Sequence, residues 1–310
     1  MKKPLVIVVV GPTASGKTTL SIELAKKLGG EIVSADSMQI YQNMDIATAK
    51  PDKEEMQGIP HHLIGFLPVG EGFSVAKYKQ MALSAVKDIL SRGKQPIVVG
   101  GTGLYIDTLV KNTEFLDYEE SGIRQSLEER CENKGIESLY SELLKIDPES
   151  AEKLHLNDTK RIIRALEVYY ATGKTMSCQR EFSHLNESEY DWCLIGINAE
   201  NRQLLYDRIN KRVDIMCEKG LIEEAHGFFS LPCSDTARQA IGYKEIKPYI
   251  DGIVSLEDAL EELKRETRRY AKRQLTWFRK NDKVNWIYID NITGDEIIQK
   301  ALDIIGNYRS

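Results

Sequence analysis

A glycine-rich loop near the start of the chain is the feature that most constrains its fold. Residues 8–20 read VVVGPTASGKTTL, and Gly11, Gly16, Lys17 and Thr18 fit the pattern G-x-x-x-x-G-K-[ST] without a mismatch. An apolar run typical of a buried strand precedes the loop, and an amphipathic helical pattern follows it. In this setting the loop binds phosphates, because its backbone N–H groups and the positive end of the helix dipole surround phosphate oxygens.

Individual side chains of the loop have separate expected roles. The Lys17 ammonium neutralises the outer phosphate, and the Thr18 hydroxyl is the expected ligand of Mg²⁺, the one cofactor that we predict. The loop alone leaves the reaction open, since kinases, motor ATPases and enzymes with a diphosphate leaving group all need such a cradle. The predicted phosphate-binding residues are Gly11, Pro12, Thr13, Ala14, Ser15, Gly16, Lys17 and Thr18.

The alternation of strand and helix patterns sets the fold class. Strand patterns separated by helical ones indicate parallel pairing with right-handed crossovers. Residues 117–190 are instead helical in period and poor in strand signals, which favours an inserted domain. We therefore predict an α/β fold: a P-loop NTPase-like core with a parallel sheet flanked by helices (1–116 and 191–310), plus an inserted all-helical domain (117–190). The strand signals cover 5–10, 31–37, 191–199 and 284–290, and residues 95–105 supply a further strand followed by a glycine-rich turn.

Composition excludes several classes of protein. The N-terminal apolar run resembles a signal peptide only superficially, because it is too short to span a bilayer and ends in the glycine loop. We expect no membrane partner, a cytoplasmic location and a monomer. The five cysteines form no C-x-x-C pair, so we expect free thiols and no zinc. A net charge of −5 neither supports nor excludes an RNA partner.

A carboxylate follows the second predicted strand. Asp36 lies in SADSMQIY, and the carboxyl ends of parallel strands meet at one edge of a sheet, so Asp36 is expected near the bound phosphates. It is alternatively a helix cap or a solvated loop acid. In a kinase it would bind Mg²⁺ or accept a proton from a substrate hydroxyl.

Seven segments together resemble the bacterial tRNA dimethylallyltransferases, and the resemblance runs from about residue 5 to residue 290. The segments are GPTASGKT, SADSMQIY, MDIATAKP, VVGGTGLY, KRIIRALEVY, RQAIGYKE and KRQLTWFRK. The resemblance implies transfer of a dimethylallyl group from dimethylallyl diphosphate to N6 of adenosine 37 in tRNA. Diphosphate leaves, and ATP is not consumed.

The resemblance also implies roles for catalytic residues. Asp36 would accept the proton of the weakly nucleophilic adenine amine. Lys17, the loop amides and Mg²⁺ on Thr18 would balance the growing charge on the departing diphosphate, helped by a distant arginine. Arg208 and Arg212, four residues apart, are the candidates for that arginine; a surface salt-bridged to neighbouring acids is the alternative.

Contacts with tRNA are implied on several segments. Arg161 and Arg164 are three residues apart and share one helix face, for which a solvated surface is the other interpretation. The family usually has Gln where this chain has Lys160, and a lysine there still suits a phosphate. The glycines of GGTGLY allow close approach to a ligand or make a plain turn. The predicted tRNA-binding residues are Asp36, Ser37, Met38, Gln39, Thr102, Arg124, Lys160, Arg161, Arg164, Arg238, Gly242 and Tyr243.

Three other functions compete with this interpretation. A small-molecule or nucleotide kinase shares the phosphate loop and the acid at a strand end. An adenylate isopentenyltransferase prenylates free AMP, but that substrate needs neither a helical insertion nor the basic stretch over 261–283, which is either an RNA-facing helix or a solvated face. A non-enzymatic RNA-binding module leaves the phosphate loop unexplained.

Overall fold

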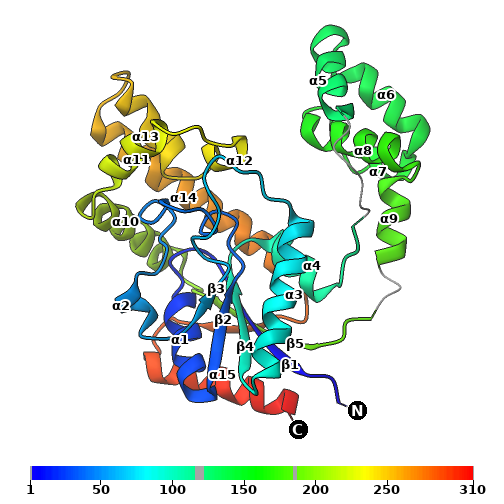
Figure 1. Ribbon diagram of the computed structural model, residues 1–310. Helices are drawn as coiled ribbons and strands as arrows, with labels where there is room; N and C mark the ends of the chain where they lie inside the picture. Colours follow the sequence, from blue (N-terminus) through cyan, green and yellow to red (C-terminus); the bar gives the residue numbers. More distant parts are fainter. Residues whose placement is uncertain (1, 116–121, 184–186, 310) are drawn as a thin grey trace. The chain divides into compact units, whose positions relative to one another are not determined.

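A single parallel sheet organises the chain (Figure 1). The computed structural model describes residues 2–115, 122–183 and 187–309. In these ranges the sheet has six strands in the order β3-β2-β4-β1-β5-β6, and every neighbouring pair is parallel. The strands are β1 (Leu5–Val10), β2 (Gly30–Ser34), β3 (His61–His62), β4 (Gln95–Gly100), β5 (Asp191–Asn198) and β6 (Asn285–Tyr288).

The sheet confirms the predicted parallel α/β class, with one addition. Strand β3 was not predicted, because two residues are too few to show an alternating pattern. It pairs with β2 at the edge of the sheet, and the His62 imidazole lies 2.8 Å from a Glu31 carboxylate oxygen.

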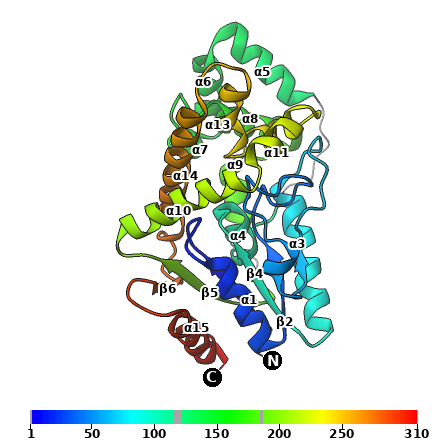
Figure 2. The ribbon, with the colours of Figure 1, turned by 90° about the vertical axis from the view of Figure 1, so that its left-hand side faces the viewer.

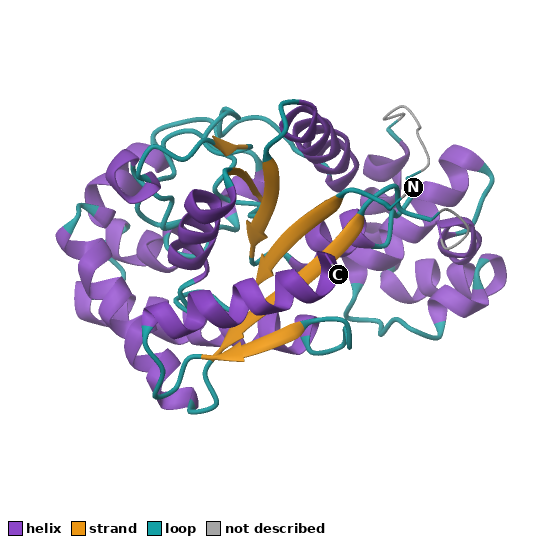
Figure 3. Cartoon of the chain, turned by 90° about the horizontal axis from the view of Figure 1, so that it is seen from below, coloured by secondary structure: helices purple, strands orange, loops and turns teal. Residues whose placement is uncertain are grey.

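Helices cover both faces of the sheet, which explains why its central strand β1 is apolar throughout. On β1, Ile7 and Val9 join the core cluster formed with α1 (Lys17–Leu28) and α15 (Gly294–Arg309). Helix α3 (Val75–Ser91) contacts β2 and β4 from the other side (Figure 2). Seen from below, α15 runs across the strands (Figure 3).

A second core holds the loop that follows β2. Ile40, Tyr41 and Met44 from this loop pack with Phe228 and Tyr243 of the helices that follow β5. These helices thereby stand over the carboxyl ends of the strands, where the candidate site lies. The remaining helices of the sheet-containing part are α2 (Lys53–Met56), α4 (Gly103–Val110), α10 (Arg202–Glu218), α11 (Leu221–Phe229), α12 (Asp235–Arg238), α13 (Tyr243–Ile250) and α14 (Leu256–Phe278).

The chain divides into two compact units. Unit 1 comprises 1–106 and 189–310, and unit 2 comprises 107–188. The start predicted for the insertion, residue 117, lies outside the described residues. Unit 2 surrounds its own core of Leu127, Leu139 and Ile162. Its helices are α5 (Ile123–Lys134), α6 (Ile136–Ile146), α7 (Pro148–Ala151), α8 (Thr159–Thr172) and α9 (Met176–Ser183). Within the described ranges every helix is too short or too polar to cross a bilayer.

Candidate active site

The glycine-rich loop between β1 and α1 has the backbone of an anion cradle. Gly11 and Gly16 have φ values of +147° and +99°, and Ala14 has φ +62°, so the chain turns repeatedly through left-handed conformations. Such turns direct successive N–H groups toward one point. The buried Ser15 hydroxyl has no hydrogen-bond partner in the described part of the protein. A bound phosphate would satisfy such a group.

Lys17 opens α1 and lines the cavity above the loop. Its Nζ donates to the Pro12 carbonyl oxygen at 2.6 Å. The pKa of Lys17 is lowered to about 7, first by burial and then by the positive charge of Arg212, while the negative charge of Asp36 opposes both. The two charged groups therefore lie close enough to Lys17 to act on the same ammonium.

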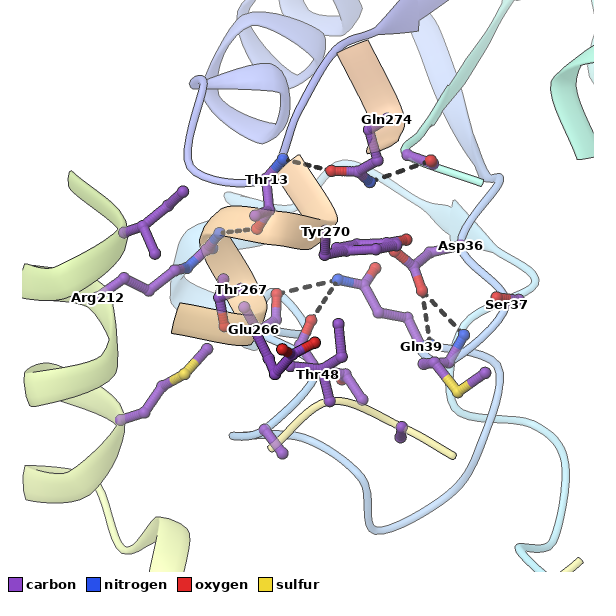
Figure 4. A pocket seen from close by; sticks show the side chains of 18 of the residues that line it. Thr13, Asp36, Ser37, Gln39, Thr48, Arg212, Glu266, Thr267, Tyr270 and Gln274 are labelled. Atoms are coloured by element: carbon purple, nitrogen blue, oxygen red, sulfur yellow. Dashed lines mark hydrogen bonds between the residues drawn. The ribbon is translucent and has the colours of Figure 1, made fainter. Parts of the chain in front are cut away.

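Asp36 is fixed by its own loop just after β2. Its Oδ1 accepts hydrogen bonds from the backbone N–H groups of Met38 at 2.9 Å and Gln39 at 3.2 Å (Figure 4). No residue in the described ranges donates to Oδ2. The carboxylate thus caps a turn of its own loop; no helix begins there, and Asp36 lines the cavity.

Gln274 of α14 joins the phosphate loop to the turn after β4. Its Oε1 accepts from the Thr13 N–H at 2.8 Å, and its Nε2 donates to the Gly101 carbonyl at 3.0 Å (Figure 4). A Cβ on Gly101 would lie 2.0 Å from that Nε2, and one on Gly103 would lie 2.3 Å from the Trp277 ring. Two glycines of GGTGLY therefore allow close approach of α14, and Gly101 also lines the cavity.

Gln274 and Tyr270 were not among the residues predicted from the sequence. Gln274 shares the buried face of α14 with Ala271 and Phe278, where an amide needs partners. A polar residue in a core position of an otherwise apolar stripe is the signal that marks it. Tyr270 lies beside Asp36 in Figure 4, and burial together with the Asp36 charge raises the pKa of its phenol.

The arginine pair on α10 separates in the structure. Arg212 lines the cavity, and its Nη1 donates to the Thr13 hydroxyl at 3.2 Å. Burial lowers the pKa of Arg212, and the charges of Glu55 and Asp36 raise it. Arg208 is exposed and does not line the cavity; its charge acts on Asp290. Of the two candidates, the structure therefore brings only Arg212 to the site.

Another wall of the cavity is the loop 45–49, which is held by the Glu224 carboxylate. Glu224 of α11 accepts hydrogen bonds at 2.7–2.9 Å from the backbone N–H groups of Asp45, Ile46 and Ala47. The Gln39 side chain donates to the carbonyl oxygens of Thr48 and Ala49, both at 3.0 Å. This wall is therefore set by bonds to α11 and to the Asp36 loop.

The cavity that these elements enclose has both polar and apolar lining residues. Its volume is about 450 Å³, within the usual range of small-molecule sites. Lys17, Thr18 and Asp36 line it together with Ser37, Met38 and Gln39. Ile209, Val213, Met216, Ala240 and Leu263 supply apolar surface. Such a lining suits a ligand with an anionic head and a short hydrocarbon tail.

The remaining tRNA-binding candidates of unit 1 differ in exposure. Thr102 accepts from the Ser37 N–H at 3.0 Å, so it supports the Asp36 loop. Arg238 is exposed at the end of α12. Tyr243 is completely buried, stacks on Phe228 and donates to Glu224 at 2.7 Å. The Tyr243 side chain therefore belongs to the core, and the predicted contact of this residue with tRNA stays a prediction. Gly242 is buried beside it.

In unit 2 the predicted basic residues lie on two neighbouring helices. Lys160, Arg161 and Arg164 are exposed on α8, and Arg124 is exposed on α5. The Nη1 atoms of Arg124 and Arg164 lie 3.5 and 3.1 Å from the same Glu167 carboxylate oxygen. Glu167 is 6% exposed and holds both guanidinium groups on one surface.

Known proteins similar to this chain share one activity name. The profile of the IPP transferase family matches residues 39–281. The tRNA dimethylallyltransferase of Acetivibrio thermocellus is 53% identical over 96% of each chain, and that of Bacillus anthracis is 49% identical over 92% of this chain and 91% of its own.

Solved structures agree with the sequence comparisons. The tRNA delta(2)-isopentenylpyrophosphate transferase of Staphylococcus epidermidis is 45% identical, with a TM-score of 0.72 over 98% of this chain and 100% of its own. A eukaryotic dimethylallyltransferase acting on tRNA is 31% identical, with a TM-score of 0.80 over 98% of this chain and 80% of its own. Because the family profile matches most of the chain and these relatives match nearly all of it, the chain belongs to the tRNA dimethylallyltransferase family.

Proposed function

We propose that this protein transfers the dimethylallyl group of dimethylallyl diphosphate to N6 of adenosine 37 in tRNA and releases diphosphate. The observation that carries the proposal is that the phosphate loop and Asp36 line the same cavity. The negative charge of Asp36 is close enough to Lys17 of the loop to raise the pKa of that lysine. Family membership supports the choice of donor and acceptor.

The carboxylate suits the acceptor side of the reaction. The exocyclic amine of adenine is a weak nucleophile, because its lone pair is delocalised into the ring. Oδ2 of Asp36 is oriented by the two N–H bonds to Oδ1, so it can accept a hydrogen bond from the amine and then its proton. As the new C–N bond forms, the allylic C–O bond breaks and its electrons leave with the diphosphate.

The cradle suits the donor side. Departure of diphosphate concentrates negative charge on its oxygens, and the loop N–H groups, Lys17 and Arg212 are placed to balance that charge. Because Lys17 and Arg212 are partly withdrawn from water, their interaction with the leaving group is screened less than at a surface. Arg212 is also tied to the loop through Thr13, which positions it for this task.

Mg²⁺ is the proposed cofactor, and the residues present fit it. Magnesium prefers hard oxygen ligands and keeps several waters, so one hydroxyl and the diphosphate oxygens suffice. Thr18 lines the cavity next to Lys17 and supplies that hydroxyl. Bound there, the ion would neutralise charge on the departing diphosphate.

The tRNA is the proposed partner of both units. Asp36, Ser37, Met38 and Gln39 line the cavity that would receive the extruded base. Lys160, Arg161, Arg164 and Arg124 form an exposed cationic surface suited to phosphates. A monomer in the cytoplasm, with no zinc, remains our prediction from the sequence.

Incubation with labelled dimethylallyl diphosphate, Mg²⁺ and an unmodified anticodon stem-loop tests the proposal. We expect label in the RNA, lost when adenosine 37 is replaced by guanosine. A parallel reaction with AMP separates tRNA prenylation from prenylation of the free nucleotide. Transfer of the γ-phosphate of ATP, or label in AMP alone, would contradict the proposal.

A further inference from the structure

A second cavity lies beside the candidate active site within unit 1. It has a volume of about 340 Å³ and is lined by Phe229, Leu231, Cys233, Arg238, Lys244 and Lys247. These residues come from the ends of α11, α12 and α13 and from the segment between α11 and α12. Lys244 also lines the active-site cavity, so the two cavities share a wall.

Two of the three cations of the second cavity have no carboxylate partner within the described residues. Arg238 and Lys244 are exposed, and neither forms an ion pair in the part of the chain that the structure describes. By contrast, Arg265 and Arg269 of α14 and Arg124 and Arg164 of unit 2 each pair with a carboxylate. Lys247, one helical turn after Lys244 on the same face of α13, adds a third cation and pairs with Asp251. Three clustered cations attract a phosphate group strongly.

The same cavity offers an aromatic and apolar surface. Phe229 is half-buried and fixed by edge contacts with Phe228 and Tyr243, at ring-centroid distances of 5.2 and 6.5 Å. Lys247 lies 5.3 Å from the centroid of the Phe229 ring. Leu231 is 42% exposed beside these groups. Cations around an aromatic surface are the combination that binds unpaired nucleotides, because phosphates need charge and bases need a flat apolar partner.

From these contacts we infer that the second cavity binds the nucleotide next to the prenylated adenosine, with its phosphate on Arg238, Lys244 and Lys247 and its base against Phe229. The inference rests on the proposed function. An acidic peptide would satisfy the charges equally, but the shared Lys244 wall favours RNA. If one base of an RNA enters the active-site cavity, the neighbouring nucleotide lies next to Lys244, because Lys244 lines both cavities.

Binding of the anticodon stem-loop by two variants tests the aromatic and the cationic parts separately. Phe229→Leu keeps an apolar side chain and removes the aromatic face, and we expect the RNA Kd to rise about 10-fold. That increase should disappear on RNAs in which an abasic residue replaces the 5′ or the 3′ neighbour of adenosine 37, which identifies the bound nucleotide. Lys247→Gln should reduce the slope of log Kd against log salt by about 0.7 to 0.9.

Matched controls separate a local effect from a general one. Lys26→Gln removes another exposed lysine that pairs within its helix, and Lys26 lines neither cavity; we expect an unchanged slope. Thermal midpoints within a few degrees of wild type would show that the variants are folded. The KM for dimethylallyl diphosphate should stay at the wild-type value, because the donor binds in the other cavity.

The rate of Cys233 alkylation measures RNA binding at the second cavity in the wild-type protein. Cys233 lines the second cavity and Cys217 lines neither, so saturating stem-loop should slow alkylation of Cys233 and leave Cys217 unaffected. Wild-type Kd values for both variants, with equal Cys233 alkylation with and without RNA, would overturn the inference even if the RNA is prenylated. Protection by an acidic peptide but not by the stem-loop would also overturn it. Failure of the wild-type protein to prenylate RNA would count against the proposed function instead.

Discussion

The cations of the cavity and those of unit 2 are both proposed to bind phosphate groups, but their surroundings are opposite. Lys17 and Arg212 are withdrawn from water, their pKa values are lowered by burial, and backbone or hydroxyl oxygens of the phosphate loop hold them. Arg161 and Arg164 on α8 are exposed and paired with carboxylates at the surface. Low screening suits a site that must stabilise developing charge, whereas exposed pairs exchange readily for phosphates. The proposed function therefore gives catalysis to the buried set and substrate retention to the exposed set.

Removal of the Asp36 carboxylate should give the largest loss of activity. Asp36→Asn retains an oxygen for the loop N–H bonds but cannot take a proton, so we expect kcat to fall about 10²- to 10⁴-fold. The Kd for dimethylallyl diphosphate, measured without RNA well below pH 7 where Lys17 stays charged, should change little. Asp303→Asn, a change at an exposed acid of α15, is the control. An Asp36→Asn enzyme with wild-type kcat would remove the carboxylate from the chemistry.

Loss of the amide bridge should come next. Gln274→Ala leaves the Thr13 N–H and the Gly101 carbonyl without their partner, and a buried unsatisfied group costs about 1–3 kcal/mol. We expect a lower thermal midpoint and a kcat reduced about 10-fold, since small displacements of a catalytic loop are costly. Gln203→Ala, at an exposed amide of α10, should change neither. An unaltered kcat would mean that the loop holds its shape without α14.

The sequence predicted the sheet and the cradle better than the rest of the site, for a physical reason. Phosphate loops and buried parallel strands are local patterns, so Gly11 to Thr18 and four of the five expected strands appear close to their predicted bounds. The strand after the first helix ends at Ser34 instead of residue 37, because the polar residues that follow form the Asp36 turn.

Residues defined by tertiary contacts were missed or left open. Gln274 is 173 residues from its partner Gly101, and no local pattern connects them. Tyr243 sits in a motif implied to bind tRNA, yet its side chain is taken up by Phe228 and Glu224. The four-residue spacing of Arg208 and Arg212 places both on one helix face. The packing of α10 decides that Arg212 lines the cavity and Arg208 does not.

The titration of Lys17 gives a smaller effect with a defined sign. With a pKa of about 7, Lys17 loses its charge as pH rises through neutrality, so the Kd for dimethylallyl diphosphate should rise above about pH 7. Arg212→Gln removes a positive neighbour and should move this transition to higher pH. Asp36→Asn removes a negative neighbour and should move it to lower pH. Shifts of both variants in one direction would contradict the charge arrangement of the cavity.

Changes on unit 2 should have the smallest effect and should appear in RNA binding alone. Arg164→Gln removes one exposed cation, so we expect the RNA Kd to rise about 3-fold and the slope of log Kd against log salt to decrease by about one contact. The kcat at saturating RNA and the KM for the donor should remain at wild-type values, because Arg164 does not line the cavity. Lys153→Gln, at a surface lysine of unit 2 that also pairs with a carboxylate, should alter neither the RNA Kd nor the salt slope. If Arg164→Gln lowered kcat at saturating RNA, the separation of retention from catalysis would fail, since a surface cation would then contribute to the step that Lys17 and Arg212 support.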